Sequence, residues 1–469
     1  MGVVVESSVW EPSVSLYVFL VICIYFSLTL SSRASSSTTN SNINNNGRYD
    51  NYDNATNKWP FPSPFDHSSS AFIRFQRKFI LLYALASVKE GMWSVIGELD
   101  FTRFGTGKDA ALASLCVGYS ASLLVGTFLG ILSDSIGHKK ACLLFCILHL
   151  VVGVWRTLAS HPSVWFASVC LSLATSIFSC SFESWLVVEH EQQGYRQDAL
   201  NETFWLMTFV ESAALVGSQV LANSLVGSDM GRGMVPFSSV AIFVAVIGIV
   251  YLGKGWKQIA QVTETKDYGV SYVHLLRDKR LWLLGLAHTC LHFSVAIFWI
   301  LWAPILVADG REVNLGLVYP CLLGARMLGS TVFQWLLSGP SSPRIEDCLA
   351  GAFVVLGIVL SIVAYDYQEI GVLVSLFCLF HAGVGLILPS LARLRTIHVP
   401  SDLRGGMISL SLTPGNAVIL FLLIQRGYYQ NIENSTLLAL AALALFVAAG
   451  CMHLLKRWGK QLYYSGHKL

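Results

Sequence analysis

The sequence predicts an all-α polytopic membrane protein: a core of twelve transmembrane helices in two halves of six, with one extra N-terminal transmembrane helix. Two observations support this fold class. Of the 469 residues, 54% are hydrophobic and only 13% are charged, whereas an ordinary soluble domain is roughly 25% charged. In addition, apolar segments of about 17 to 25 residues, the length that crosses a bilayer, recur along the whole chain. A spanning segment must satisfy its own backbone hydrogen bonds, so these segments are predicted to be helices.

The apolar segments fall at approximately 14–31, 78–97, 110–133, 141–159, 163–188, 200–227, 236–253, 281–308, 315–338, 347–364, 371–392, 405–427 and 436–455. The segment at 14–31 is predicted to be an extra N-terminal transmembrane helix within residues 1–31. It is preceded by Glu6 and Glu11 rather than by the basic residues of a signal peptide, so we expect it to stay in the mature protein. Residues 32–77 begin with a Ser/Asn-rich tract and are predicted to be a disordered cytoplasmic linker.

The remaining twelve segments form two sixes, predicted as an N-terminal half at 78–253 and a C-terminal half at 281–456. A basic loop at 254–280 separates them, and a tail at 457–469 follows. With this loop and the tail in the cytoplasm, 23 Lys and Arg residues lie on the cytoplasmic side, six lie on the other side and two lie within helices. Such a bias sets the orientation of a membrane protein. Both ends of the core are therefore predicted to be cytoplasmic, and Met1 to be outside.

Epitope tags at the two termini test this orientation. On intact cells the tag at Met1 should be accessible to antibody and the tag at Leu469 should not. Equal accessibility of the two tags would show that the first segment does not span the membrane in the mature protein.

Several function classes are disfavoured. A net charge of +3 without a basic patch interleaved with aromatic residues predicts no nucleic-acid partner. There is no P-loop motif for ATP, and no recognisable nucleophile or metal motif, so we expect neither an enzyme nor a cofactor or metal. The eleven cysteines stand singly in apolar runs; Cys142 and Cys146 lie one helical turn apart, but packing is the favoured interpretation.

The segment GILSDSIGHKK at 130–140 interrupts two apolar runs. It predicts a tight cytoplasmic turn, in which Gly130 permits close helix packing and Gly137 adopts a turn conformation that a side chain would resist. Lys139 and Lys140 hold the turn on the cytoplasmic side. Asp134 is left at the membrane boundary and needs a positive partner.

These residues resemble the G-x-L-x-D-x-x-G-x-K-K turn of the major facilitator superfamily, which implies a major-facilitator-like core. The resemblance implies that Asp134 latches the two halves together against the helix that begins at Arg404, through a cation and a positive helix end. Ser135 and His138 depart from the pattern, since arginine or lysine is usual at both positions.

The run SFESWLVVEH at 181–190 resembles a signature of the molybdate-anion transporter branch of this superfamily. That branch also begins with an extra apolar segment, and further similarities lie at 301–304 and 389–404. The chain departs from the branch at several polar positions where other charged residues are usual. These departures mark it as a divergent member, and they lie at Lys89-Glu90-Gly91, His292, His381 and Thr413-Pro414.

Polar residues recur at helical spacing inside several apolar segments and predict either a polar cavity between the halves or buried pairs that hold helices together. The substrate-binding candidates combine cations with hydrogen-bonding groups: Arg326, Lys89, Glu90, Ser330, Gln334 and Asn416. The proton-coupling candidates are Glu90, Glu211, His292 and His381. Glu183 suits a latch as well as a cavity and is assigned to gating with Gly130, Asp134, Gly137, Lys139, Lys140 and Arg404.

The resemblance and the polar helices together predict a secondary active transporter in a lipid bilayer, either the plasma membrane or an internal membrane. Its expected substrate is a small solute, molybdate or a related oxyanion by resemblance, with protons as a possible coupling ion. Two alternatives stay open: a carrier of sugars or other organic solutes, and a non-transporting sensor or scaffold on the same fold.

Overall fold

The computed structural model describes residues 64–466 apart from 104–107, 160–162, 196, 227–233, 256–276, 339–343, 366–368 and 430–431, together with residues 18, 21, 22 and 25. The first group of helices comprises α2 (Pro64–Arg103), α3 (Lys108–Ala121) with α4 (Thr127–Ile136), α5 (His138–Leu158), α6 (Val164–Gln192), α7 (Gln197–Val226) and α8 (Met234–Gly255). The second group comprises α10 (Lys279–Leu306), α11 (Leu315–Ser338), α12 (Ile345–Ala364), α13 (Ile370–His398), α14 (Arg404–Tyr429) and α15 (Asn434–Gly466).

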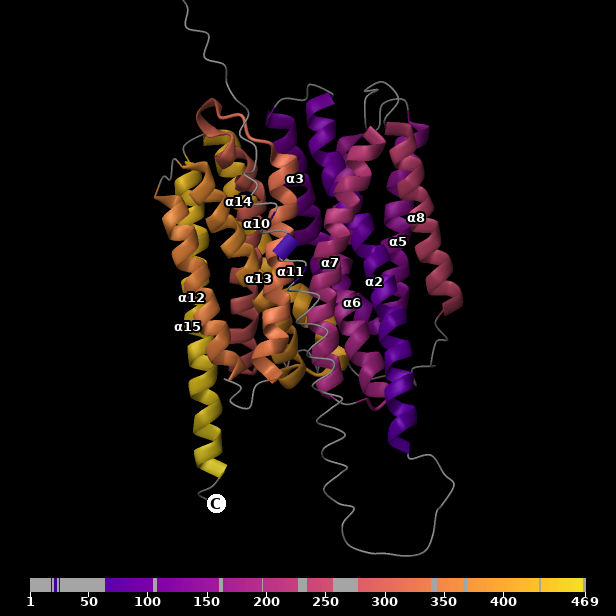
Figure 1. The fold of residues 1–469 in the computed structure, drawn as a ribbon, viewed down its shortest axis with the longest axis vertical. Helices are drawn as coiled ribbons and strands as arrows, with labels where there is room; N and C mark the ends of the chain where they lie inside the picture. The colour runs from indigo at the N-terminus through magenta and orange to yellow at the C-terminus, as the bar shows by residue number, and fades with distance from the viewer. Residues whose placement is uncertain are drawn as a thin grey trace, which may run out of the picture.

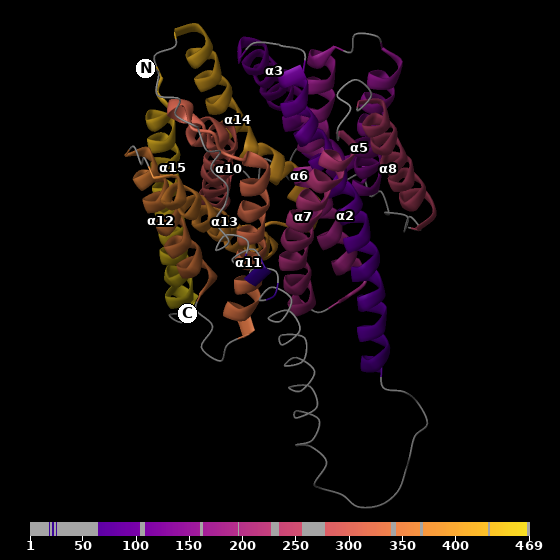
Figure 2. The ribbon, with the colours of Figure 1, turned by 45° about the horizontal axis from the view of Figure 1, so that its top comes forward.

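The two groups lie side by side, with the indigo-to-magenta helices α2–α8 next to the orange-to-yellow helices α10–α15 (Figures 1 and 2). They meet where α7 packs against α11 and where α4 packs against α14. In the described part of the chain, ten helices are long and apolar enough to cross a membrane. A shorter apolar stretch at Ser238–Lys254 in α8 and the long α2 add to these. The predicted all-α membrane fold is confirmed.

Some predicted boundaries are wrong. Helix α2 begins at Pro64, so residues 64–77 belong to a helix rather than to the predicted linker. Phe72 and Phe75 are buried in this part of α2 and pack against Tyr195, with ring centroids 5.2 and 5.8 Å away. Helix α15 likewise continues to Gly466, through most of the predicted tail. The predicted extra helix at 14–31 lies outside the described residues, except for residues 18, 21, 22 and 25, which are helical.

The predicted span at 110–133 is two α-helices joined by a π-helical turn, Ser122–Gly126. In this turn the Ser122 hydroxyl donates to the carbonyl oxygen of Ser172 on α6 at 3.3 Å, and Ser176 donates to the Ser122 hydroxyl at 3.2 Å. Single π-turns inside α-helices are frequent at functional sites. The helix that follows this turn, α4, packs against α14.

Each group has its own apolar core, one centred on α10–α15 and the other on α2, α5, α6 and α7. Lipid is as apolar as these side chains, so helix association within a membrane depends on close packing rather than on burial from water. Helices α11 and α13 approach each other closely, and a Cβ on Gly385 would collide with the carbonyl oxygen of Arg326. This contact fixes the part of α11 that carries Arg326.

Candidate functional site

An ion pair joins the two groups of helices near the middle of α7 and α11. Nη2 of Arg326 on α11 donates to Oε1 of Glu211 on α7 at 2.9 Å, and the phenol of Tyr83 on α2 donates to Oε2 of Glu211 at 2.8 Å. The side chains of Arg326 and Glu211 are 11% and 20% exposed. Sequence reasoning identified both charged residues but did not pair them. The structure pairs Arg326 with Glu211.

Arg326 keeps free hydrogen-bonding capacity, because its buried Nε has no partner among the described residues. His381 on α13 is also fully buried, and neither of its ring nitrogens has a partner in that part of the chain. The His381 ring contacts Phe298 and Trp299 of α10, each with centroids 4.8 Å away. The region around Arg326 therefore combines a cation, a polar imidazole and aromatic surfaces.

Glu90 on α2 forms a separate polar cluster inside the first group. His149 Nε2 on α5 lies 3.4 Å from Glu90 Oε1, and the Thr175 hydroxyl on α6 donates to Glu90 Oε2 at 2.9 Å. His149 did not emerge from the sequence, because an isolated histidine in an apolar run carries no spacing signal. All three residues belong to one group, so this cluster does not bridge the two.

Lys89 does not reach the Arg326 region. It is 2% exposed, and its Nζ lies 2.9 Å from the Cys146 sulfur and 4.8 Å from the centre of the Phe145 ring, both on α5. Consecutive residues of a helix point about 100° apart, which turns Lys89 into the first group while Glu90 faces His149. The prediction that Lys89 and Arg326 lie together at one site is therefore wrong.

The remaining substrate and proton candidates lie within the second group. His292 Nε2 on α10 lies 2.7 Å from Asn416 Oδ1 on α14, so these two residues meet each other rather than Arg326. The Ser330 hydroxyl donates to the carbonyl oxygen of Met327 in its own helix at 2.7 Å. Gln334 lies one helical turn beyond Ser330 on α11, towards its C-terminal end.

A second site, which we call the gate, comprises Asp134, Glu183, Arg395 and Arg404. Asp134 at the end of α4 accepts hydrogen bonds from the backbone N–H groups of Gly405 at 3.0 Å and Gly406 at 2.7 Å. These are the orphan donors of the first turn of α14, where a carboxylate is favoured. These bonds join α4 to the start of α14 in this structure.

Glu183 on α6 holds two arginines of the second group. Arg395 on α13 donates from Nε and Nη2 at 2.8 and 2.5 Å, and Arg404 at the start of α14 donates from Nη2 at 2.7 Å. Arg404 was expected to supply a cation to Asp134, and this is wrong: its guanidinium donates to Glu183, whereas Asp134 accepts hydrogen bonds from the backbone of α14. Sequence reasoning did not place Arg395 at the gate.

The turn after α4 shapes the gate. Gly137 has φ 97°, a conformation that favours glycine, and a Cβ on Gly130 would collide with the carbonyl oxygen of Gly405. Lys139 and Lys140 follow at the start of α5, and the Lys140 side chain is exposed. His138, where the superfamily has a base, lies with Nε2 3.8 Å from Asp134 Oδ1.

Asp134→Asn should weaken the closed gate, since a neutral amide interacts less with the positive end of α14. We expect a loss of about 0.3 to 1 kcal/mol if the site is hydrated, and up to ~2 kcal/mol for this buried carboxylate. Labelling of engineered cysteines from the gate end should increase, while expression and melting temperature stay close to those of the wild type. Unchanged labelling would mean that Asp134 does not stabilise the closed state.

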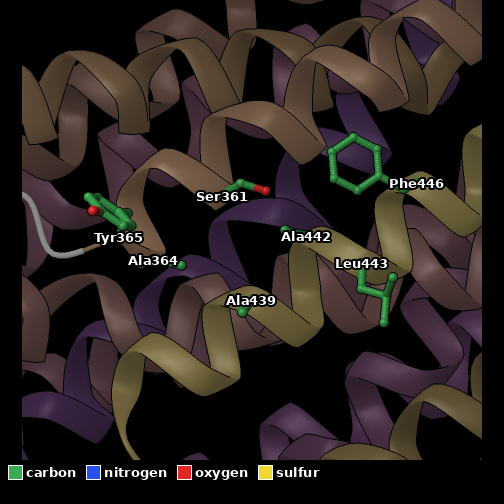
Figure 3. Close-up of a pocket in the computed structure, with 7 residues that line it drawn as sticks. All are labelled: Ser361, Ala364, Tyr365, Ala439, Ala442, Leu443 and Phe446. Atoms are coloured by element: carbon green, nitrogen blue, oxygen red, sulfur yellow. The ribbon is translucent and has the colours of Figure 1, made fainter.

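A pocket of about 420 Å³ lies elsewhere, between α12 and α15 (Figure 3). Its lining is mostly small and apolar: Ser361, Ala364, Tyr365, Ala439, Ala442, Leu443 and Phe446. The Ser361 hydroxyl donates to the carbonyl oxygen of Gly357 in its own helix at 2.8 Å. The pocket shares no residue with the Arg326–Glu211 pair or with the gate. Over the described residues, no group of three His, Cys, Asp or Glu side chains could hold a metal ion.

Comparisons with known proteins agree on the architecture. The profile of a major facilitator family described as sugar transporters with 12 transmembrane segments matches residues 65–411. The chain is 25% identical over 352 residues to the molybdate-anion transporter of Xenopus tropicalis, covering 73% of this chain and 76% of that protein. It is 23% identical over 383 residues to the molybdate-anion transporter of Danio rerio, covering 73% and 77%.

Two solved structures share the fold. A bacterial homologue of the iron transporter ferroportin, in an outward-facing state, superposes with a TM-score of 0.64 at 16% identity, covering 81% of this chain and 99% of that chain. The fucose:proton symporter of E. coli superposes with a TM-score of 0.63 at 14% identity, covering 82% and 99%.

Proposed function

Because the chain belongs to the major facilitator superfamily, and is therefore a multi-pass membrane transporter, we propose that it moves molybdate or a related oxyanion by alternating access of its two groups of helices. The observation that supports this most is the Arg326–Glu211 pair. It places a fixed cation and a partly exposed acid at the contact between the groups, where transporters of this build bind their substrates.

The pair also suggests how transport is coupled. A dianion approaching Arg326 is repelled by Glu211 as long as that carboxylate is ionised, since like charges oppose each other strongly away from bulk water. A proton on Glu211 removes the repulsion and leaves the arginine available to the anion. Arginine suits this role, because its planar fork can bond two oxygens of one oxyanion. We therefore assign proton coupling to Glu211 rather than to Glu90, His292 or His381.

The halves would move about the contacts that now close the gate. Thr127 on α4 and Thr413 on α14 have their hydroxyl oxygens 2.9 Å apart, and the Ser409 hydroxyl donates to the carbonyl oxygen of Thr127 at 2.6 Å. Together with the Asp134 contacts, these bonds join α4 to α14 from the gate towards the middle of the membrane. Alternating access requires that they break together when the gate opens.

A sugar or another organic solute is the second candidate, supported by the aromatic rings next to His381. Trp299 lies with its ring centroid 5.6 Å from that of Tyr319 and 6.1 Å from that of Trp302, and such surfaces can stack on a sugar ring. Trp302 is nearly buried, however, which favours packing for that ring.

Uptake into proteoliposomes tests the proposal. The purified protein should accumulate labelled molybdate with saturation, and unlabelled tungstate should compete while fucose and xylose should not. Saturable sugar uptake without molybdate uptake would favour the second candidate. Uptake of neither class would favour a sensor or scaffold.

A further inference from the structure

At the centre of the gate, two arginines bind one carboxylate, that of Glu183. Glu183 is a single carboxylate, yet it accepts hydrogen bonds from both Arg395 and Arg404. The Asp134 carboxylate is engaged by the backbone of α14 instead of by either guanidinium. Two cations therefore share one anion at a place where both arginines are buried, at 7% and 0% exposure.

Each arginine also retains an unused donor. The Nη1 atoms of Arg395 and Arg404 are buried, and neither has a hydrogen-bond partner among the described residues. The two guanidinium groups are close neighbours, because both donate to the same oxygen, Glu183 Oε1, at 2.8 and 2.7 Å. Together they offer adjacent planar forks, which is the arrangement that binds the oxygens of a tetrahedral oxyanion.

The positions of the three residues decide what happens on opening. Arg395 and Arg404 lie on α13 and α14 of the second group, whereas Glu183 lies on α6 of the first. Separation of the groups at this end removes the carboxylate and leaves the two cations together. The two guanidinium groups then lack the carboxylate that neutralised them, and an anion with two negative charges matches their combined charge.

We propose that the open gate is an anion-binding site. In it, the transported dianionic oxyanion takes the place of Glu183 and binds to Arg395 and Arg404. The site receives the oxyanion between the central Arg326 region and the solution at the gate end. Glu183 and the oxyanion thus compete for one pair of arginines, and the presence of substrate on this side favours the open gate. This inference rests on the transport function proposed above and adds a second substrate site to it.

Glu183→Gln tests the site without requiring the gate to open, because it removes the counter-charge and leaves both arginines. The variant is made together with Arg326→Gln, so that the central site does not contribute, and is purified in detergent. Molybdate should raise the melting temperature of this double variant at concentrations roughly tenfold lower than for Arg326→Gln alone, the scale of one charged contact. Sodium chloride at matched ionic strength should not raise the melting temperature in this way.

Three comparisons make the result decisive. Adding Arg395→Gln to the double variant should abolish the gain. Equal responses with and without Glu183→Gln would overturn the proposal, and equal stabilisation by sulfate, phosphate and molybdate would overturn the assignment of the site to the transported oxyanion. The melting temperature reports binding and not transport. A failure of the wild type to take up molybdate would therefore count against the proposed function, whereas the melting experiment would still test the anion site at the gate.

A cross-linking experiment covers the case in which Glu183→Gln does not fold. Cysteines at Thr127 and Thr413, whose hydroxyls are 2.9 Å apart in the closed gate, report closure through disulfide formation. In the Arg326→Gln background, molybdate should slow the cross-link several-fold, and Arg395→Gln should remove that effect. A cross-linking rate that molybdate leaves unchanged would contradict the competition between Glu183 and the oxyanion.

Discussion

Arg326→Gln is expected to abolish molybdate uptake while the protein still reaches the membrane. The substitution removes the cation that the two groups of helices share at the Glu211 contact and leaves a shorter, neutral amide. Hydrogen bonds to charged groups contribute about 1.5 to 3 kcal/mol each, so losing a two-pronged contact with an oxyanion amounts to at least about 3 kcal/mol. Uptake at low molybdate should therefore fall by roughly a hundredfold or more, measured in proteoliposomes with equal amounts of inserted protein.

Two matched variants distinguish substrate binding from a structural ion pair. Arg326→Lys keeps the charge but loses the planar fork, so it should fold normally and bind molybdate much more weakly than the wild type. The double variant Arg326→Gln with Glu211→Gln removes both charges of the pair, which restores electrical balance without restoring an anion site. Full uptake by this double variant would show that Arg326 only neutralises Glu211.

The sequence predicted which helices exist, but it predicted only one contact between the halves, that of Asp134 with the helix that begins at Arg404. Apolar length alone indicated the spanning segments, because a bilayer admits few alternatives to a helix. It failed at the ends, where Phe72 and Phe75 extend α2 into a polar region by packing on Tyr195. No length criterion can detect that contact.

The candidate sites also contain features that the sequence could predict and features that it could not. The turn around Asp134 was predictable because its residues are neighbours in sequence, and its partner at the start of α14 was implied by the resemblance to the superfamily. Glu183 and Arg395 are 212 positions apart, and Glu211 and Arg326 are 115 apart. Helical spacing gives the face on which a residue lies within its own helix, but pairing across the molecule depends on the packing of two groups. Lys89 illustrates the limit: it was placed by its charge beside Arg326 and lies against Cys146 instead.

Glu211→Gln is expected to separate molybdate exchange from proton-driven accumulation. The amide resembles the protonated carboxyl in shape and charge, so Arg326 stays available to the anion at every pH. Exchange of labelled for unlabelled molybdate should persist, whereas accumulation driven by an acidic outside solution should be lost. In the wild type, uptake should rise as the external pH falls, because protonation removes the repulsion between Glu211 and the dianion.

Glu90→Gln is the matched control for this prediction. Glu90 is also an acid within the helices, with a side chain 20% exposed like that of Glu211, but it contacts His149 and Thr175 rather than a permanent cation. Its neutralisation leaves the Arg326–Glu211 pair intact, and proton-driven accumulation should therefore survive. If accumulation is lost in Glu90→Gln and kept in Glu211→Gln, the coupling proton binds at the α2–α5–α6 cluster, and Glu211 serves only to hold Arg326 in place between turnovers.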